Sequence, residues 1–230
     1  MWTKTIRALL GLLGIVKKTT VFTTKDNAEF LATREPGEVI LVGPGNSALS
    51  QGIANAEGNP INGQGGFFSH ALIHVGQEWG QKMRKLHPEL CKIPGVGNIA
   101  AQNEIIEAEG TGIQIDTLAK YTNGNTQLAG FTLSLTDTQL EKLFLWLYQQ
   151  VGKPYGYLDF ITELFPNPSD IPVSDPGFIC SGLCATDYKG QLNINIVDPR
   201  IDSHKADPQD IYDFLEPQLL WGRHFYNMEL

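Results

Sequence analysis

The stretch of sequence that decides the fold is Ser-His-Ala-Leu-Ile-His-Val-Gly, at residues 69–76. Its apolar residues, flanked by histidines and ended by a glycine, predict a buried β-strand. His70 stands at the start of this strand, so it lies where the strand enters the predicted sheet. From that position its ring can reach a neighbouring element. Side chains alternate along a strand, so His74 falls on the same face. His70 is therefore a candidate functional residue, and His74 is a candidate binding residue in the wall of the same site.

A second strand, predicted at residues 103–108, is associated with three glutamates, the last of them just after its end. Alternation places Glu107 and Glu109 on one face and Glu104 on the other. Either Glu107 or Glu109 can orient a histidine ring from a neighbouring strand. We take Glu107 as the first candidate for this role and Glu109 as its competitor.

The third candidate is Cys180, which follows Phe178 and Ile179 and opens a predicted helix. A cysteine at a helix N-terminus lies at the positive end of the helix dipole, which favours its thiolate and lowers its pKa. A nearby imidazole lowers that pKa further, and a carboxylate on the other ring nitrogen fixes the tautomer. Free N–H groups of the helix can stabilise an oxyanion. A cysteine, a histidine and a glutamate brought together in this way make a nucleophilic acyl-transfer site.

Each of these residues also has a simpler interpretation. His70 alone can be a hydrogen-bonded histidine at a strand end, and Cys180 alone can be a small buried apolar residue. Cys184, one turn further along the predicted helix, is expected in the core, and no chemical role is expected for Cys91. A metal site built from His70, His74 and a glutamate is an alternative. Because it leaves Cys180 without a role, we expect neither a metal ion nor another cofactor.

Composition limits the class of protein. The chain has 230 residues, of which 42% are hydrophobic and 18% charged, which excludes a disordered chain. Its 17 basic and 25 acidic residues give a formal net charge of −8, so we expect no nucleic-acid partner. An odd number of cysteines, three in all, does not resemble a disulfide framework.

The remaining pattern predicts an α+β fold in which a central antiparallel sheet packs against helices. Thr136 and Gln139 form the pattern of a capping box before an apolar stripe, which predicts a helix that ends at Gly152. Residues 77–102 are a probable insertion that is helical at its start. Further strands are expected at residues 38–42, 112–115, 127–135 and 192–197, and further helices at residues 48–55 and from residue 207.

The N-terminal segment, residues 1–35, is predicted to be a helical appendage to a domain that spans residues 36–230. Four apolar residues at helical spacing indicate an amphipathic helix, namely Ile6, Leu9, Leu10 and Leu13. Residues 19–35 are expected to extend or connect this helix. It packs on the domain or, as an alternative, makes a weak membrane or partner contact. No convincing signal-peptide cleavage site precedes Pro36, so a cytoplasmic location is favoured.

The chain resembles the permuted branch of the NlpC-type, papain-like cysteine amidases, of which the YiiX-like proteins are one group. In that family the histidine strand precedes the cysteine helix, as it does here. The resemblance covers about residues 36–215 and is carried by Gly37-Glu38-Val39-Ile40-Leu41, Ser69-His70-x-x-Ile73-x-x-Gly76, Ile105-Ile106-Glu107-Ala108, Gly152-Lys153-Pro154-Tyr155-Gly156, Phe178-Ile179-Cys180-Ser181-x-Leu183 and Asp207-Pro208-Gln209-Asp210-Ile211.

The resemblance implies a permuted papain-like fold with the cysteine at a helix N-terminus. It implies that Cys180 is the nucleophile, His70 the base and Glu107 the orienting residue. Ser181 and Tyr155, within the matching motifs, are candidate binding residues. The chain departs from the family at His74 and Gly182 and in the length of segment 77–102.

The activity implied by the resemblance is that of a thiol hydrolase, a cysteine peptidase or amidase. It would cleave an amide bond of a cell-wall peptide, or of another N-acyl amide, through an acyl-enzyme. One alternative is a lipid ester hydrolase or acyltransferase of the same fold, as in the lecithin–retinol acyltransferases. Another is a non-catalytic module that binds a peptide or acyl chain. The expected partner is accordingly a peptide, amide or acyl substrate.

Overall fold

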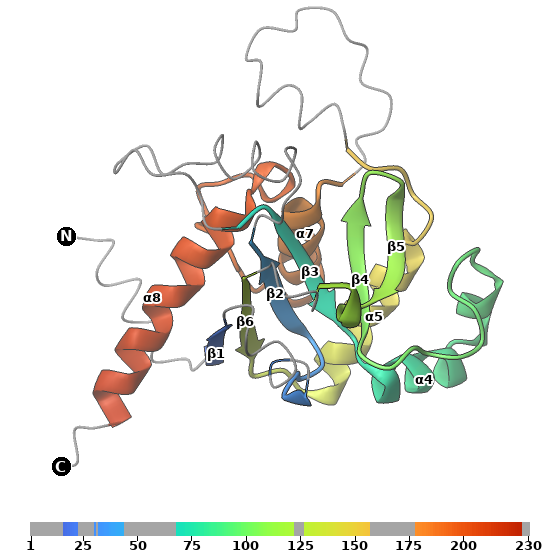
Figure 1. Ribbon diagram of the computed structural model, residues 1–230, viewed down its shortest axis with the longest axis horizontal. Helices are drawn as coiled ribbons and strands as arrows, with labels where there is room; N and C mark the ends of the chain where they lie inside the picture. The colour runs from blue at the N-terminus through green and yellow to red at the C-terminus, as the bar shows by residue number, and fades with distance from the viewer. Residues whose placement is uncertain are drawn as a thin grey trace, which may run out of the picture.

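An antiparallel sheet with the strand order β1-β6-β2-β3-β4-β5 forms the centre of the described part of the chain (Figure 1). The computed structural model describes residues 16–22, 30, 32–43, 68–121, 127–156 and 178–226, with side chains except at 16–22 and 219–226. The strands are β1 (Val16–Phe22), β2 (Glu38–Val42), β3 (His70–His74), β4 (Glu104–Glu109), β5 (Gly112–Thr117) and β6 (Leu128–Leu133). The sheet and the helices around it confirm the predicted α+β class.

The central strands are β2 and β3, whose apolar residues are almost completely buried. The predicted strand around His70 is confirmed, and His70 is its first residue. Antiparallel pairing places Val42 beside His70 and Leu72 beside Glu107. The register therefore brings the start of β3 close to the end of β4, where the predicted site residues lie.

The helices pack against the sheet, and the two share one large apolar core cluster. The helices are α4 (Gln77–Leu86), α5 (Asp137–Gln150), α7 (Cys180–Leu192) and α8 (Pro208–Tyr226). The predicted capping box is confirmed, because the Thr136 side chain and the Gln139 side chain each bond the other's backbone N–H. Phe144 of α5 and Leu183 of α7 share this cluster with Ile73 of β3. In this way α7, and Cys180 with it, is packed against the sheet.

A smaller apolar cluster includes Leu72 of β3 and Ile105 of β4, together with Phe30 and Leu118. Alternation sets these strand residues on the face opposite Ile73, which lies in the large cluster. Leu118 begins the short 3-10 helix η3 (Leu118–Tyr121) and is fully buried. Its N–H also bonds the carbonyl of Asn103. These contacts fix η3 beside β4.

Residues 77–102, predicted as an insertion, form α4 and the 3-10 helix η2 (Pro88–Lys92). Trp79, Met83 and Leu90 are buried in the large cluster. Arg84 is also buried, and it donates to both carboxylate oxygens of Glu104 at 3.0 Å. The Glu104 side chain is thus used to hold this segment on the core, on the face away from Glu107.

Three predicted elements differ from the structure. Residues 16–22, expected in the helical appendage, form strand β1, which pairs with β6. Residues 192–197 are not a strand: α7 ends at Leu192, and Asn193 caps it with a left-handed φ of 54°. The helix expected to be short at residue 207 is α8, of 19 residues, with the 3-10 turn η4 (Ser203–Lys205) before it.

The expected helices at residues 6–13 and 48–55 lie outside the described residues. Among the helices that are described, none has the length and apolar character needed to cross a bilayer.

Candidate active site

Cys180 is the first residue of α7, as predicted, and its side chain has little exposure. Ile179 before it has the extended backbone of a helix N-cap (φ −75°, ψ 162°). The backbone N–H groups of Ala71 in β3 and of Ser181 donate to the sulfur. The thiol is therefore held between the start of the helix and the start of the histidine strand.

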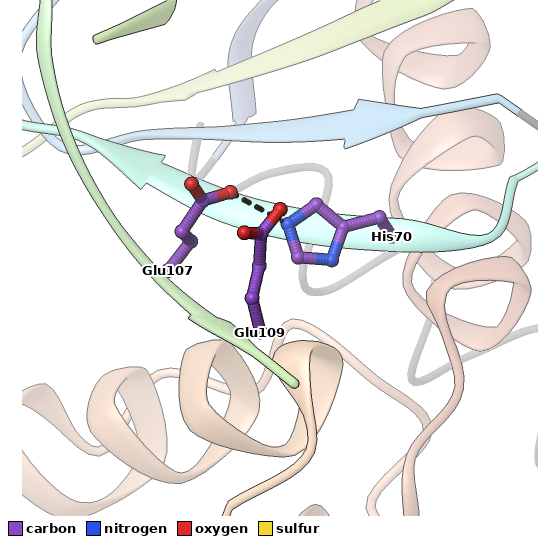
Figure 2. Close-up of side chains that lie close together, drawn as sticks. All are labelled: His70, Glu107 and Glu109. Atoms are coloured by element: carbon purple, nitrogen blue, oxygen red, sulfur yellow. Dashed lines mark hydrogen bonds and ion pairs between the residues drawn. The ribbon is translucent and has the colours of Figure 1, made fainter. Parts of the chain in front are cut away.

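His70 connects this thiol to a carboxylate. Its Nε2 lies 2.7 Å from Oε2 of Glu107 (Figure 2). The ring also forms a hydrogen bond with the side chain of Cys180. Because Glu107 occupies Nε2, the nitrogen left for the sulfur is Nδ1. The predicted juxtaposition of Cys180, His70 and Glu107 is thus confirmed as geometry, while their catalytic roles stay a prediction.

Two carboxylates compete for His70, and the structure distinguishes them. Figure 2 shows the side chains of Glu107 and Glu109, both from β4, turned toward the His70 ring, with the bond to Glu107 dashed. Continuing the β3–β4 register places Glu109 directly opposite His70 and Glu107 diagonally. Glu109 instead accepts a bond from Gln114 at 2.8 Å. The buried Glu107 is therefore the partner of the histidine.

The pKa values follow from these contacts. Burial alone would raise the pKa of Cys180, but the His70 imidazolium and the backbone donors lower it. Burial would likewise lower the pKa of His70, yet the charges of Cys180 and Glu107 raise it to about 10. Burial opposes ionisation of Glu107, and its bonds to His70 and Lys120 still lower its pKa to about 2. These pKa shifts favour a Cys180 thiolate, a His70 imidazolium and a Glu107 carboxylate, side by side.

The other cysteines have different surroundings. Cys184 is fully buried one turn further along α7, in the large core cluster, as predicted. Its burial and the charge of Cys180 raise the pKa of the Cys184 thiol well above its usual value. A buried neutral thiol is a poor nucleophile. Cys91 lies in η2 and is partly exposed.

The three predicted binding residues lie in different places. His74 is at the far end of β3, about 13 Å from His70 at the usual strand rise. Its Nδ1 bonds the carbonyl of Glu35 at 3.1 Å, so it is a buried structural residue and not a wall of the site. Ser181 is fully buried beside Cys180, and its Oγ has no hydrogen-bond partner among the described residues. Tyr155 forms a β-bridge with Phe178, two residues before Cys180.

The position of His74 also removes the metal alternative that required it together with His70. Among the described residues, ligand atoms of His70, Glu107 and Glu109 do lie within 4.8 Å of one another. However, the Lys120 ammonium bonds Glu107 at 2.5 Å and Glu109 at 2.8 Å. A cation thus already sits between the two carboxylates, and the geometry fits an ion-paired network better than a metal centre.

Two residues of this network were not predicted from the sequence, Lys120 and Tyr121, both in η3. Tyr121 Oη donates to Oε2 of Glu107 at 2.6 Å. One signal pointed to such residues: two glutamates on the same strand face repel each other, and a cation between them is favourable where they are buried. Lys120 is a basic residue that follows the β4–β5 hairpin closely, but no sequence pattern shows that η3 folds back over β4.

Comparisons of the chain with protein-family models, with curated proteins and with solved structures found no significant match.

Proposed function

We propose that the protein is a thiol hydrolase in which Cys180 attacks the carbonyl carbon of an amide bond. The observation that carries the proposal is the continuous hydrogen-bonded row from Cys180 through His70 to Glu107. Each member has a pKa displaced toward the ionised form, even though all three lie in surroundings that disfavour charge. Such displacement by specific charge partners is typical of catalytic groups.

The reaction would follow from the geometry. The Cys180 thiolate adds to the carbonyl. N–H groups of the first turn of α7, other than that of Ser181, which bonds the sulfur, stabilise the oxyanion. The His70 imidazolium then gives its proton to the departing amine, which leaves an acyl thioester on Cys180. Neutral His70 next takes a proton from water, whose hydroxide attacks the thioester and releases the acid. Glu107 keeps the ring oriented and stabilises its charge throughout.

The arrangement of elements supports a permuted papain-like fold of the NlpC type. The histidine strand β3 precedes the cysteine helix α7 in the chain, and both belong to one antiparallel sheet and its helical cover. The third residue of the site comes from β4, the strand next to β3. The fold assignment rests on this order together with the motifs described above.

We infer that the substrate is a peptide amide, with cell-wall peptides or other N-acyl amides as the first candidates. Acyl transfer from a lipid ester shares the same thioester intermediate and differs only in whether water or another nucleophile accepts the acyl group. A module that merely binds a peptide or acyl chain needs no such row of charges. Burying ionised groups costs several kcal/mol unless they are paired.

The proposal is tested by trapping the thioester. The protein is mixed with p-nitrophenyl acetate and with N-acyl p-nitroanilides, and chromophore release and intact mass are followed. We expect a burst of one equivalent and an acetyl group on the peptide that contains Cys180. Cys180→Ala should abolish both the burst and the acetylation. Cys91→Ala, which removes the thiol in η2, should retain them. Equal turnover by Cys180→Ala and the native protein would contradict the proposal.

A further inference from the structure

Two consecutive residues of η3 hold the carboxylate that orients His70. The Glu107 side chain is fully buried, so each of its oxygens depends on protein donors. Oε1 accepts a bond from the Lys120 ammonium at 2.5 Å. Oε2 accepts from Tyr121 Oη at 2.6 Å and faces His70 Nε2 at 2.7 Å. Of these contacts, only the one with His70 belongs to the catalytic row described above.

Lys120 is fixed by three carboxylates, one for each of its ammonium hydrogens. Besides Glu107, it donates to Glu109 at 2.8 Å and to Asp116 at 3.1 Å. Lys120, Gln114 and Tyr121 all donate to the Glu109 carboxylate. The His70 ring bonds Glu107, although the strand register sets Glu109 opposite it. Lys120 therefore holds both glutamates in the arrangement in which the histidine bonds Glu107.

Tyr121 acts from the other side of the carboxylate. Its ring packs beside the His70 ring, with the centroids 5.9 Å apart and the planes at 38°. Burial and the neighbouring Glu107 raise the pKa of its hydroxyl, so it remains a neutral donor. Tyr121 thus supplies a hydrogen bond to Oε2 without adding charge.

We propose that Lys120 and Tyr121 are positioning residues of the acyl-transfer site, which hold Glu107 ionised and directed at His70; this rests on the function proposed above. Lys120 supplies the positive charge that keeps Glu107 ionised, and the hydrogen bond from Tyr121 directs Oε2 of Glu107 at His70. Both residues bond Glu107, which in turn bonds the His70 ring, so both act on the ring through Glu107.

The two roles give different signatures. Replacing Lys120 by methionine removes a positive charge near His70 and Cys180, so both groups bind their protons more tightly. The acid limb of the pH–rate profile, set by the thiol, and the alkaline limb, set by the imidazolium, should both move up by roughly 0.5–1 pH unit. Lys120→Arg keeps the charge and should keep both limbs in place. Tyr121→Phe should lower the rate about 10-fold with little movement of either limb.

The experiment measures kcat/KM for p-nitrophenyl acetate between pH 5 and pH 11, with the full chain and the three variants. Circular dichroism checks that each variant is folded. A folded Lys120→Met whose two limbs coincide with those of the native protein overturns the role of Lys120. If both Lys120 variants fail to fold, Tyr121→Phe decides, and a native rate for that variant overturns the proposal.

The same data separate this inference from the proposed function. If the native protein shows no turnover that depends on Cys180, the proposed function fails. If the native protein shows a bell-shaped, Cys180-dependent profile that neither Lys120→Met nor Tyr121→Phe alters, only the positioning role fails.

Discussion

Glu107 illustrates how a single residue can be charged without contact with water. Its side chain has no exposure, and an isolated carboxylate in such surroundings would take up a proton. Donors from His70, Lys120 and Tyr121 replace the lost water. The bonds and charges of His70 and Lys120 lower the pKa of Glu107 to about 2. The charge of Glu107 in turn raises the pKa of His70, which keeps the imidazolium available as an acid.

This coupling predicts the effect of Glu107→Gln. Loss of the carboxylate charge lowers the pKa of His70, so the alkaline limb of the activity profile should move to lower pH. We expect kcat to fall roughly 10²-fold. The matched control is Glu109→Gln on the same strand, which makes no bond to the His70 ring and should retain most of the activity. Similar losses in both variants would show that Glu107 is not the residue that orients His70.

His74 makes a second prediction, about stability. Burial lowers its pKa from 6.5 to about 4 in the folded protein. The unfolded chain therefore takes up a proton near pH 6.5, where folded His74 does not. Between pH 6.5 and pH 4 this residue makes the free energy of unfolding fall by about 1.4 kcal/mol for each unit by which the pH falls.

Urea denaturation at pH 7, 6, 5 and 4 tests the role of His74. His74→Gln cannot titrate, but its amide can still donate to the Glu35 carbonyl. We expect its free energy of unfolding to decline less steeply than that of the native protein over this range. Parallel pH dependence for the two proteins would contradict a buried neutral His74.

At the scale of elements, α7 depends on a close approach by the turn η4. A Cβ added at Gly182 would lie 2.7 Å from the carbonyl oxygen of His204. The neighbouring His204 ring stacks on Phe178, with the centroids 5.2 Å apart. The absence of a side chain at Gly182 thus allows η4 to pack against the first turn of α7, where Cys180 lies.

Gly182→Ala should therefore destabilise the protein by about 1–3 kcal/mol, because backbone must move to admit the methyl group. Gly190→Ala on the same helix is the matched control, since nothing lies within 4 Å of a Cβ there. That exposed substitution should stabilise α7 by about 0.5–1 kcal/mol. Thermal unfolding of the two variants is the measurement, and equal midpoints would contradict the close packing of η4.

Local patterns predicted the elements that depend on nearby residues. The capping box at Thr136, the alternation around Glu107 and the position of Cys180 at a helix start are all properties of a few adjacent residues. The contribution of η3 could not be predicted, because it depends on Leu118 packing into a cluster formed by distant segments. The register alone also placed both glutamates near His70, so the choice between them depends on the side chains of η3 and β5 that bond them.

Two secondary-structure predictions were wrong for similar reasons. The alternation of apolar residues at 192–197 resembles a strand, but Asn193 adopts the left-handed conformation that ends α7. The β-branched residues of Val16–Phe22 favour a strand, and β6 provides a partner that the local sequence does not show.

At the scale of the whole molecule, the segment before β2 belongs to the packing of the sheet. Phe30 is fully buried in the smaller cluster. The Arg34 guanidinium lies 3.6 Å from the centre of the Phe30 ring and 2.5 Å from the Glu38 carboxylate. Strand β1 adds an edge to the sheet beside β6. These contacts link Val16–Phe22, Phe30 and Arg34 to the domain that was predicted to begin at residue 36.

A chain truncated to begin at Arg34 tests this link. It lacks β1 and Phe30, and loss of a buried phenylalanine alone costs about 3–5 kcal/mol. We expect at least this decrease in the free energy of unfolding, measured by urea denaturation. Phe30→Ala in the full chain separates the side chain's contribution from that of β1. A truncated chain as stable as the full chain would support a domain boundary near residue 35.

The central claim is that Cys180 is a thiolate activated by His70 and Glu107. The most direct measurement is the rate at which iodoacetamide alkylates Cys180 and Cys91 in the same protein, followed by peptide mass spectrometry from pH 5 to pH 9. We predict that Cys180 reacts faster than Cys91 at pH 6, that its rate reaches a plateau at a lower pH than that of a free thiol, and that His70→Gln removes this advantage. A Cys180 that reacts only above about pH 8.5, as a free thiol does, and is indifferent to His70→Gln would contradict the account.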